Sequence, residues 1–439
     1  MGAITNFFDR LVQRYLPDAY LFAIILTFIV FFLGVIFTEN SPVEMLVHWG
    51  DGFWDLLAFS MQMALVVITG YVLANTAIVK NFLTRLSKLA KTPGQAVMLV
   101  TFVAAMACLI NYGFGLVVGA LFAIHVARQV TEVDFRILVA AAYSSFLVWH
   151  GGFSGSIPLT VATPGHFLEE KMGVVPVSET LFSATNIFIV VALVLTLPIF
   201  NRFLIPKNSK TIEDRSQWSL PEDEAVMTFT EPKTPAEKLE NSKIISLLVG
   251  FMGLGYIAYH FITRGFDLNI NIVNFTILFL GILLHKTPRQ FLNTVANGIK
   301  NAGSIIIQFP LYAGIMGMVT YSGLSEQISL WFVSFANEYT LPYISFISGG
   351  LINIFVPSGG GQWAVQGPIM IDAALAIDAD LAKTAMGVAW GDAWTNMIQP
   401  FWALPALAIA GLGIRDIMGF CVMILFYSFI PITIGFLLF

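Results

Sequence analysis

The segment 356–363, VPSGGGQW, interrupts a long apolar stretch between residues 342 and 377. A proline, a serine and three consecutive glycines cannot continue a helix at this point. In hydrocarbon every backbone N–H and C=O group must be paired, so irregular backbone persists only where it is buried in protein or lines a watery cavity. If the chain spans a membrane, the segment is therefore predicted to belong to a binding site.

The composition supports a membrane-spanning chain. Of its 439 residues 57 % are hydrophobic and 11 % are charged, whereas soluble domains carry roughly 25 % charged residues. Many apolar runs have a length of about 20 residues, which a helix needs to cross a bilayer core. We therefore predict an all-α polytopic membrane protein. Cys108 and Cys421 both fall in apolar runs, where packing is expected rather than a disulfide or a metal site.

The order of elements occurs twice: two spans, an interrupted apolar pair, a broken span and a further span. A shift of 242 positions places Asn111 on Asn353 and His150 on Asp392. Repeats with matching interruptions are typical of secondary transporters, and the interruptions indicate the binding site.

The repeats define the predicted domain organisation, which has about nine spans plus two re-entrant hairpins. The first inverted repeat is 1–205, a polar cytoplasmic linker is 206–243, and the second inverted repeat is 244–439. The expected internal elements are hairpin one at about 96–127, a broken helix at about 137–163, an extra span at 244–262, hairpin two at about 342–377 and a second broken helix at about 383–411.

The basic residues predict an orientation. The extra span inverts the second repeat, and a cytoplasmic N-terminus leaves only Lys171, Arg264 and Lys383 outside, of 22 Lys and Arg residues. This asymmetry follows the positive-inside rule. We expect a multi-pass protein of the bacterial cytoplasmic (inner) membrane, with hairpin one entering from the cytoplasm and hairpin two from outside. No nucleic-acid partner is expected.

Each interruption presents the N-terminus of a half-helix, where unpaired N–H groups and a partial positive charge attract an anion. No Lys or Arg lies in the interruptions, so a singly charged substrate is expected. Glycines are expected to admit ligand to the backbone and to adopt left-handed dihedral angles, and Pro158 and Pro400 suit first helical turns. The alternative is that these small and hydroxyl residues serve helix packing. The predicted substrate-binding residues are Asn111, Gly113, Gly115, His150, Ser154, Gly155, Ser156, Thr160, Ser358, Gly359, Gly360, Gln362, Trp363, Trp394, Thr395, Asn396 and Gln399.

Two ionisable residues precede the two breaks, and an ionisable group inside a membrane is a functional hypothesis by default. His150 can carry a coupled proton, and Asp392 can ligate Na⁺ together with carbonyl oxygens. The alternative is that each only hydrogen-bonds a neighbouring unwound turn. No cofactor is expected other than Na⁺, for which the hairpin tips and helix breaks are the candidate positions. The predicted ion-coupling residues are His150, Asp392, Asn111, Asn353 and Asn396.

The segments 111–115 (NYGFG), 149–156 (WHGGFSGS), 356–363 and 391–400 (GDAWTNMIQP) resemble the bacterial short-chain fatty acid transporter family. The resemblance covers nearly the whole chain and implies uptake of short monocarboxylates such as acetoacetate or butyrate. It also implies membership of the broader ion transporter superfamily. A homodimer is then expected, in which each subunit has a scaffold domain and an elevator-like transport domain. The sodium-dicarboxylate branch has Ser-Asn-Thr motifs that this chain lacks, so one carboxylate is the simpler substrate.

The leading hypothesis is a symporter that couples a short-chain monocarboxylate to H⁺ or Na⁺. Another small carboxylate, such as a dicarboxylate or an amino-acid conjugate, is an alternative substrate. An anion channel would require a continuous polar stripe, whereas the polar groups here cluster at four points. An enzyme is not expected, because no set of nucleophile, base and orienting group stands out. The sequence contains no phosphate-binding Gly-x-x-x-x-Gly-Lys-Ser/Thr motif, so a pump driven by ATP is not expected.

Overall fold

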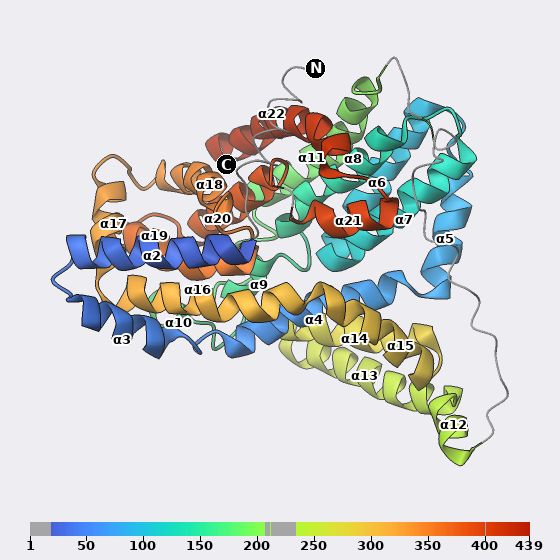
Figure 1. Cartoon of the computed structure of the whole chain (residues 1–439), viewed down its shortest axis with the longest axis horizontal. Coiled ribbons are helices and arrows are strands. Elements are labelled where there is room, and N and C mark those ends of the chain that lie inside the picture. Colours follow the sequence, from blue (N-terminus) through green and yellow to red (C-terminus); the bar gives the residue numbers. More distant parts are fainter. Residues whose placement is uncertain (1–18, 207–210, 212–233, 400) are drawn as a thin grey trace.

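The computed structural model describes residues 19–206, 211, 234–399 and 401–439, and within these ranges it contains helices and no strand. The predicted all-α class is confirmed. Figure 1 shows an elongated bundle of helices. Residues 1–18 of the predicted first repeat, most of the predicted linker 206–243, and Pro400 lie outside the described residues.

In the described part of the chain, nine helices are long and apolar enough to cross a membrane, which makes this a multi-pass membrane protein. Two of them are the arms of hairpin one, and each arm alone is long enough to cross. The re-entrant path of this hairpin therefore stays a prediction. The nine are α2 (Ala19–Phe37), α4 (Leu57–Ala74), α6 (Pro93–Ile110), α7 (Tyr112–Gln129), the broken helix Phe135–Val161, α11 (Ala184–Phe203), α13 (Lys243–Arg264), α16 (Gly303–Tyr321) and α22 (Ile414–Leu438).

Shorter helices connect these spans. Ser41 and Thr287 each accept a hydrogen bond from the third backbone amide of the helix that follows them, and each of these helices starts with proline. Proline suits the first helical position because its missing N–H would have no partner there. The connecting helices are α3 (Pro42–Gly52), α5 (Ala77–Ser87), α10 (Glu169–Met172), α12 (Pro235–Glu240), α15 (Pro288–Gly298), η2 (Ile299–Asn301) and α17 (Leu324–Val333). A shorter apolar helix, α14 (Ile270–His285), follows α13, and the predicted orientation requires it to cross the membrane as well.

Helix boundaries recur along the chain at one spacing. Pro42 and Pro288, which begin α3 and α15, lie 246 positions apart. Asp134 and Asp380 are also 246 positions apart, and the side chain of each caps the helix that follows. A spacing of 246 positions therefore also relates the two halves in the part of the repeat where we expected a spacing of 242 positions. In this register the counterpart of His150 is Asn396 rather than Asp392.

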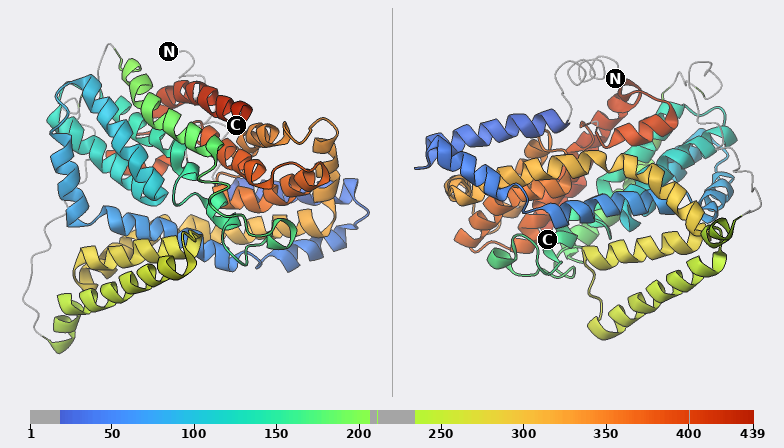
Figure 2. Two further views of the ribbon diagram at one scale, coloured as in Figure 1. Left: turned by 180° about the vertical axis from the view of Figure 1, so that it is seen from behind. Right: turned by 60° about the horizontal axis from the view of Figure 1, so that its bottom comes forward.

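The two hairpins lie at opposite ends of the long axis (Figures 1 and 2). A single residue, Asn111, separates α6 from α7, and residues 354–358 separate α18 (Leu341–Asn353) from α19 (Gly359–Ala376). Both α19 and α7 thus begin directly after a residue with extended backbone, Ser358 or Asn111, whose side chain caps the helix.

The prediction that the site glycines adopt left-handed dihedral angles is wrong. The residues 113–115 lie within α7, and the residues 359–361 form the first turn of α19. Among the described residues, the glycines with positive φ are Gly165, Gly173, Gly265, Gly323 and Gly411, none of which belongs to the predicted site. Neighbouring backbone instead comes so close that a side chain is excluded. At Gly115, for example, a Cβ would lie 2.5 Å from the backbone N of Cys108.

Both predicted broken helices are interrupted. The first consists of α8 (Phe135–Ser144), η1 (Ser145–Gly151) and α9 (Ser156–Val161). The second consists of α20 (Leu381–Thr395) and α21 (Ala403–Ala410).

A glycine seam joins hairpin two to the second broken helix. A Cβ at Gly387 would lie 2.3 Å from the carbonyl oxygen of Pro342, and a Cβ at Gly391 would lie 2.4 Å from that of Phe346. The backbones of α18 and α20 therefore touch with no side chain between them. This contact fixes hairpin two to the helix that carries Asp392.

Replacement of Gly391 by alanine tests the seam. The added methyl group must displace backbone, and overpacking of this kind costs about 1–3 kcal/mol. We expect Gly391→Ala to lower the melting temperature of the purified protein in detergent. Gly255→Ala is the matched control, because no described atom lies within 4 Å of its Cβ position and alanine is the better helix former. Equal melting temperatures for the two variants would contradict the seam.

Candidate functional site

The centre of the candidate site is a contact between the two broken helices. His150 of η1 and Asp392 of α20 are both fully buried, and His150 Nε2 lies 3.1 Å from Asp392 Oδ2. The same carboxylate oxygen accepts a hydrogen bond from Asn396 Nδ2 at 3.2 Å. A buried charge is costly unless it is paired and hydrogen-bonded. The sequence suggested separate roles for the two residues, but the structure joins them in one pair.

Asn353, the last residue of α18, ties hairpin two to this pair. Its Nδ2 group donates to the carbonyl oxygen of Asp392 at 2.9 Å, to Thr395 Oγ1 at 3.0 Å and to Asn396 Oδ1 at 2.9 Å. An amide nitrogen has two hydrogens, so three acceptors share them. The end of α20 is thus tied to the end of α18 by this side chain, in addition to the backbone bond from the N–H of Asn396 to the carbonyl of Asp392.

The tip of hairpin two reaches the same centre. A Cβ at Gly359 would lie 2.6 Å from both His150 Nε2 and Ser156 Oγ. Ser358 caps α19 by accepting a hydrogen bond from the backbone N–H of Gly361 at 3.3 Å. The first turn of a helix carries amides without intrahelical partners and a partial positive charge. The first turn of α19 thus lies against the His150–Asp392 pair.

The tip of hairpin one is fixed to the first break. Asn111 accepts from the backbone N–H of Phe114 at 2.8 Å and donates to the carbonyl of Val66 on α4 at 3.4 Å. The backbone N–H of Tyr112 donates to Ser154 Oγ at 2.8 Å. The backbone N–H of Phe153 donates to the carbonyl of Leu109 at 2.7 Å. Both hairpin tips and both breaks therefore meet in one region.

Several buried polar atoms in this region lack a protein partner among the described residues. Buried polar groups are nearly always hydrogen-bonded, so such a cluster indicates where a ligand or an ion could bind. No three His, Cys, Asp or Glu side chains of the described chain form a metal-binding group. Na⁺ takes oxygen ligands, and several of these atoms are oxygens. These atoms include His150 Nδ1, Ser156 Oγ, Asn353 Oδ1, Asp392 Oδ1 and both side-chain polar atoms of Gln399.

Several predicted site residues make contacts of the kind that the packing alternative expects. Gly113 lies against α4, where a Cβ would be 3.0 Å from Val67 Cα, and it also lines a cavity; Gly360 lies against Phe59 and Phe309. Trp394 Nε1 donates to the carbonyl of Leu425 on α22 at 2.9 Å. Others that bond or pack within their own segment or hairpin are Gly115, Gly155, Thr160, Gln362 and Trp363, although Gln362 Oε1 and Trp363 Nε1 are buried without a partner in the described chain.

Two residues that sequence reasoning missed hold the breaks in place. Tyr143 of α8 donates its hydroxyl to the carbonyl oxygen of Asn396 at 2.6 Å. Asn186 of α11 donates to the carbonyl oxygen of Gly151 at 3.3 Å and accepts from Trp390 Nε1 at 3.1 Å. An asparagine inside an apolar run was the available signal for Asn186. The sequence offered no such signal for Tyr143, because tyrosine is common in membrane helices.

The sequence of the chain is similar to those of known proteins. The family model described as "Short chain fatty acid transporter" matches residues 1–439. The chain belongs to the short-chain fatty acid transporter family. Two relatives are named "Putative short-chain fatty acid transporter". The protein of Escherichia coli (strain K12) is 48 % identical over 439 residues, all of both chains, and that of Haemophilus influenzae (strain ATCC 51907 / DSM 11121 / KW20 / Rd) is 44 % identical over 435 residues, covering 98 % of this chain and 97 % of the relative.

The fold of this family member is similar to a solved transporter structure. The crystal structure of the Alcanivorax borkumensis YdaH transporter aligns with a TM-score of 0.59 over 95 % of this chain and 98 % of that chain, at 13 % sequence identity. At this identity the likeness concerns the fold alone. Because the family and its relatives are transporters, the chain is a transporter of short-chain fatty acids and not an enzyme.

Replacement of Gly359 by alanine tests whether the centre must hold its geometry. The added methyl group displaces His150 Nε2, Ser156 Oγ or both, and a displacement of this size in a functional site costs about tenfold or more in kcat/KM. We expect this loss in the uptake of labelled butyrate by proteoliposomes. The control is Gly50→Ala on α3, where no described atom lies within 4 Å of the Cβ position. Uptake by Gly359→Ala equal to that of the control would assign Gly359 to packing.

Proposed function

We propose that this family member is a secondary active transporter that moves short-chain monocarboxylates of the size of acetoacetate or butyrate across the bacterial inner membrane, coupled to H⁺ or Na⁺. The observation that carries the proposal is the His150–Asp392 pair beside the first turn of α19. The pair supplies an ionisable group, and the helix N-terminus supplies an anion-binding element. The two are in contact, as coupling requires.

The chemistry of the centre suits a single carboxylate. Helix amides, Ser156 and Gln399 offer neutral partners, and the charged groups of the pair are one histidine and one aspartate. A carboxylate held by dipoles and hydroxyls binds less tightly than one held by arginine. Such moderate binding allows release on the far side. A dicarboxylate would bring a second negative charge close to Asp392 without a lysine or arginine to balance it.

The pair also offers a physical basis for coupling. With His150 neutral and Asp392 ionised the pair carries one negative charge, and uptake of one proton makes it neutral. An anion binds more favourably beside the neutral pair, so proton and substrate each favour the binding of the other. Asp392 Oδ2 already lies against His150 and Asn396, so we favour H⁺. Na⁺ would instead use the oxygens of Asp392, Asn353 and Ser156.

The proposed movement follows from the arrangement of the hairpins. Two inverted repeats would place hairpin one on the cytoplasmic side and hairpin two outside, with tips that meet at the pair. Their positions at opposite ends of the long axis support this arrangement. An elevator-like movement of the hairpins and broken helices against the other spans would then expose the pair to each side in turn. The family resemblance suggests that a homodimer provides the scaffold.

Transport in proteoliposomes tests the function. Labelled butyrate and acetoacetate are supplied under a pH gradient or a Na⁺ gradient imposed separately, with succinate as a competitor. We expect saturable uptake driven by the pH gradient and weak competition by succinate. Uptake driven only by Na⁺ would assign the coupling to the oxygen ligands. Absence of saturable uptake under both gradients would overturn the coupled transporter, and flux proportional to concentration would favour a channel.

The pair itself is tested by His150→Gln and Asp392→Asn. Each variant keeps a hydrogen-bonding side chain but removes the shared ionisable contact, so each is expected to lose gradient-driven accumulation while it retains the fold. The matched controls are His260→Gln and Asp267→Asn, because His260 Nε2 and Asp267 Oδ2 lie 3.5 Å apart outside the centre. Accumulation in both centre variants at the level of the controls would remove the pair from the mechanism.

A further inference from the structure

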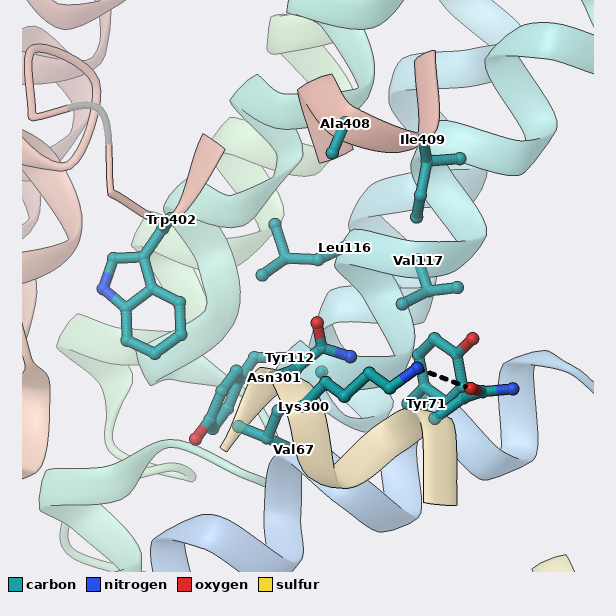
Figure 3. Close-up of a pocket in the computed structure, with 12 residues that line it drawn as sticks. Val67, Tyr71, Tyr112, Leu116, Val117, Lys300, Asn301, Trp402, Ala408 and Ile409 are labelled. Atoms are coloured by element: carbon teal, nitrogen blue, oxygen red, sulfur yellow. Dashed lines mark hydrogen bonds between the residues drawn. The ribbon is translucent and has the colours of Figure 1, made fainter. Parts of the chain in front are cut away.

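A cavity of about 410 Å³ lies between hairpin one and the helices around it, in a size range typical of small-ligand sites. Its walls come from α4, α7, α21 and the junction of α15 with η2 (Figure 3). Tyr112 and Gly113 at the tip of hairpin one and Trp402 beside the second break line it, whereas no residue of the interruption in hairpin two or of η1 does. The cavity therefore adjoins the candidate site, and neither His150 nor Asp392 lines it.

The lining of the cavity combines apolar walls with one cation. Leu116, Val117 and Ile409 form much of the apolar surface, and Lys300 extends across the chamber in Figure 3. Lys300 Nζ donates to Asn297 Oδ1 at 3.2 Å. No Asp or Glu is among the lining residues, so the chamber offers a positive charge without an acidic side chain to compete for it.

One layer of aromatic side chains separates this cavity from the pair. Tyr112 and Trp402 line the cavity, and the Tyr112 ring lies 4.8 Å from that of Trp149 and 5.7 Å from that of Trp402. The Trp149 ring in turn lies 3.7 Å from the His150 ring. A ligand in the cavity would thus be one aromatic layer away from the coupling pair.

We propose that this cavity is a second binding site for the transported monocarboxylate, where the carboxylate pairs with Lys300 and the alkyl chain lies against Leu116, Val117 and Ile409. The inference rests on the proposed function. The positive-inside orientation places Lys300 on the cytoplasmic side, and α5, which carries Lys80 and Arg85, packs against the cavity helix α7. The site would receive substrate after it leaves the centre. Because Lys300 is exposed, water weakens its ion pair, which suits a station from which substrate is released.

The charge of Lys300 is tested by comparing Lys300→Gln, Lys300→Arg and Lys88→Gln in proteoliposomes with labelled butyrate presented at the cytoplasmic face. Loss of one exposed ion pair corresponds to up to about fivefold in affinity. We expect Lys300→Gln to raise the KM by about fivefold at this face with little change in kcat. Lys300→Arg should stay within about twofold of wild type, because it keeps the charge. Lys88, exposed at the end of α5, is the control for loss of a basic residue on this side.

The apolar wall is tested by Val117→Phe, which reduces the length of the chamber. The longer acid should suffer more, since one methylene group in a hydrophobic pocket changes discrimination by about tenfold or more. We expect the ratio of KM for butyrate to KM for acetate to rise by about tenfold. Val191→Phe on the exposed face of α11 is the matched control and should leave the ratio unchanged.

The outcomes separate this site from the function on which it rests. If wild type shows no saturable flux of any short-chain acid, the proposed function fails. If wild type transports and Lys300→Gln has the KM of Lys88→Gln, the second site is overturned while transport stands. An equal rise in KM for Lys300→Arg and Lys300→Gln would also overturn it, because charge would not be the property recognised. Thermal melting of each variant identifies any that fails to fold, and the Val117→Phe ratio then decides the matter independently.

Discussion

The structure depends on one constraint: backbone polar groups inside a membrane protein must find partners within the protein. Four helix ends meet in the interior of this bundle, and they satisfy one another. The first break donates from Phe153 to hairpin one at Leu109. Hairpin two donates from Asn353 to the carbonyl of Asp392, and Tyr143 donates to the carbonyl of Asn396 at the second break. Each interruption is stable because the others are present.

The same arrangement leaves room for function. The backbone groups at these helix ends have hydrogen-bond partners, but side-chain atoms such as Asp392 Oδ1 and Ser156 Oγ have none in the described chain. These atoms surround a contact between two ionisable groups from different broken helices. A transporter requires a site that binds ion and substrate together and can then release both. Neutral partners and a pair that changes charge by one proton provide these properties without a fixed cation in the centre.

Much of this fold could be predicted from sequence because hydrocarbon imposes strict rules on apolar runs. The runs, the glycine and proline interruptions and the repeated order predicted the helical class and both broken helices. The roles of individual glycines could not be predicted, because Gly360 and Gly391 are required by neighbours that come from distant segments. The contact of His150 with Asp392 joins residues 242 positions apart, and only the crossing of the two broken helices creates it. Lys300 was overlooked because it lies in η2, outside every interruption.

A double-mutant cycle on butyrate binding tests the central claim, that His150 and Asp392 act as one proton-carrying unit. The affinity of wild type, His150→Gln, Asp392→Asn and the double variant is measured in detergent at acidic and neutral pH. Because the two residues share one function, the double variant should lose no more affinity than the single variant that binds more weakly, and the pH dependence of binding should vanish in the double variant. Additive losses, or pH-dependent binding that persists in the double variant, would contradict the claim.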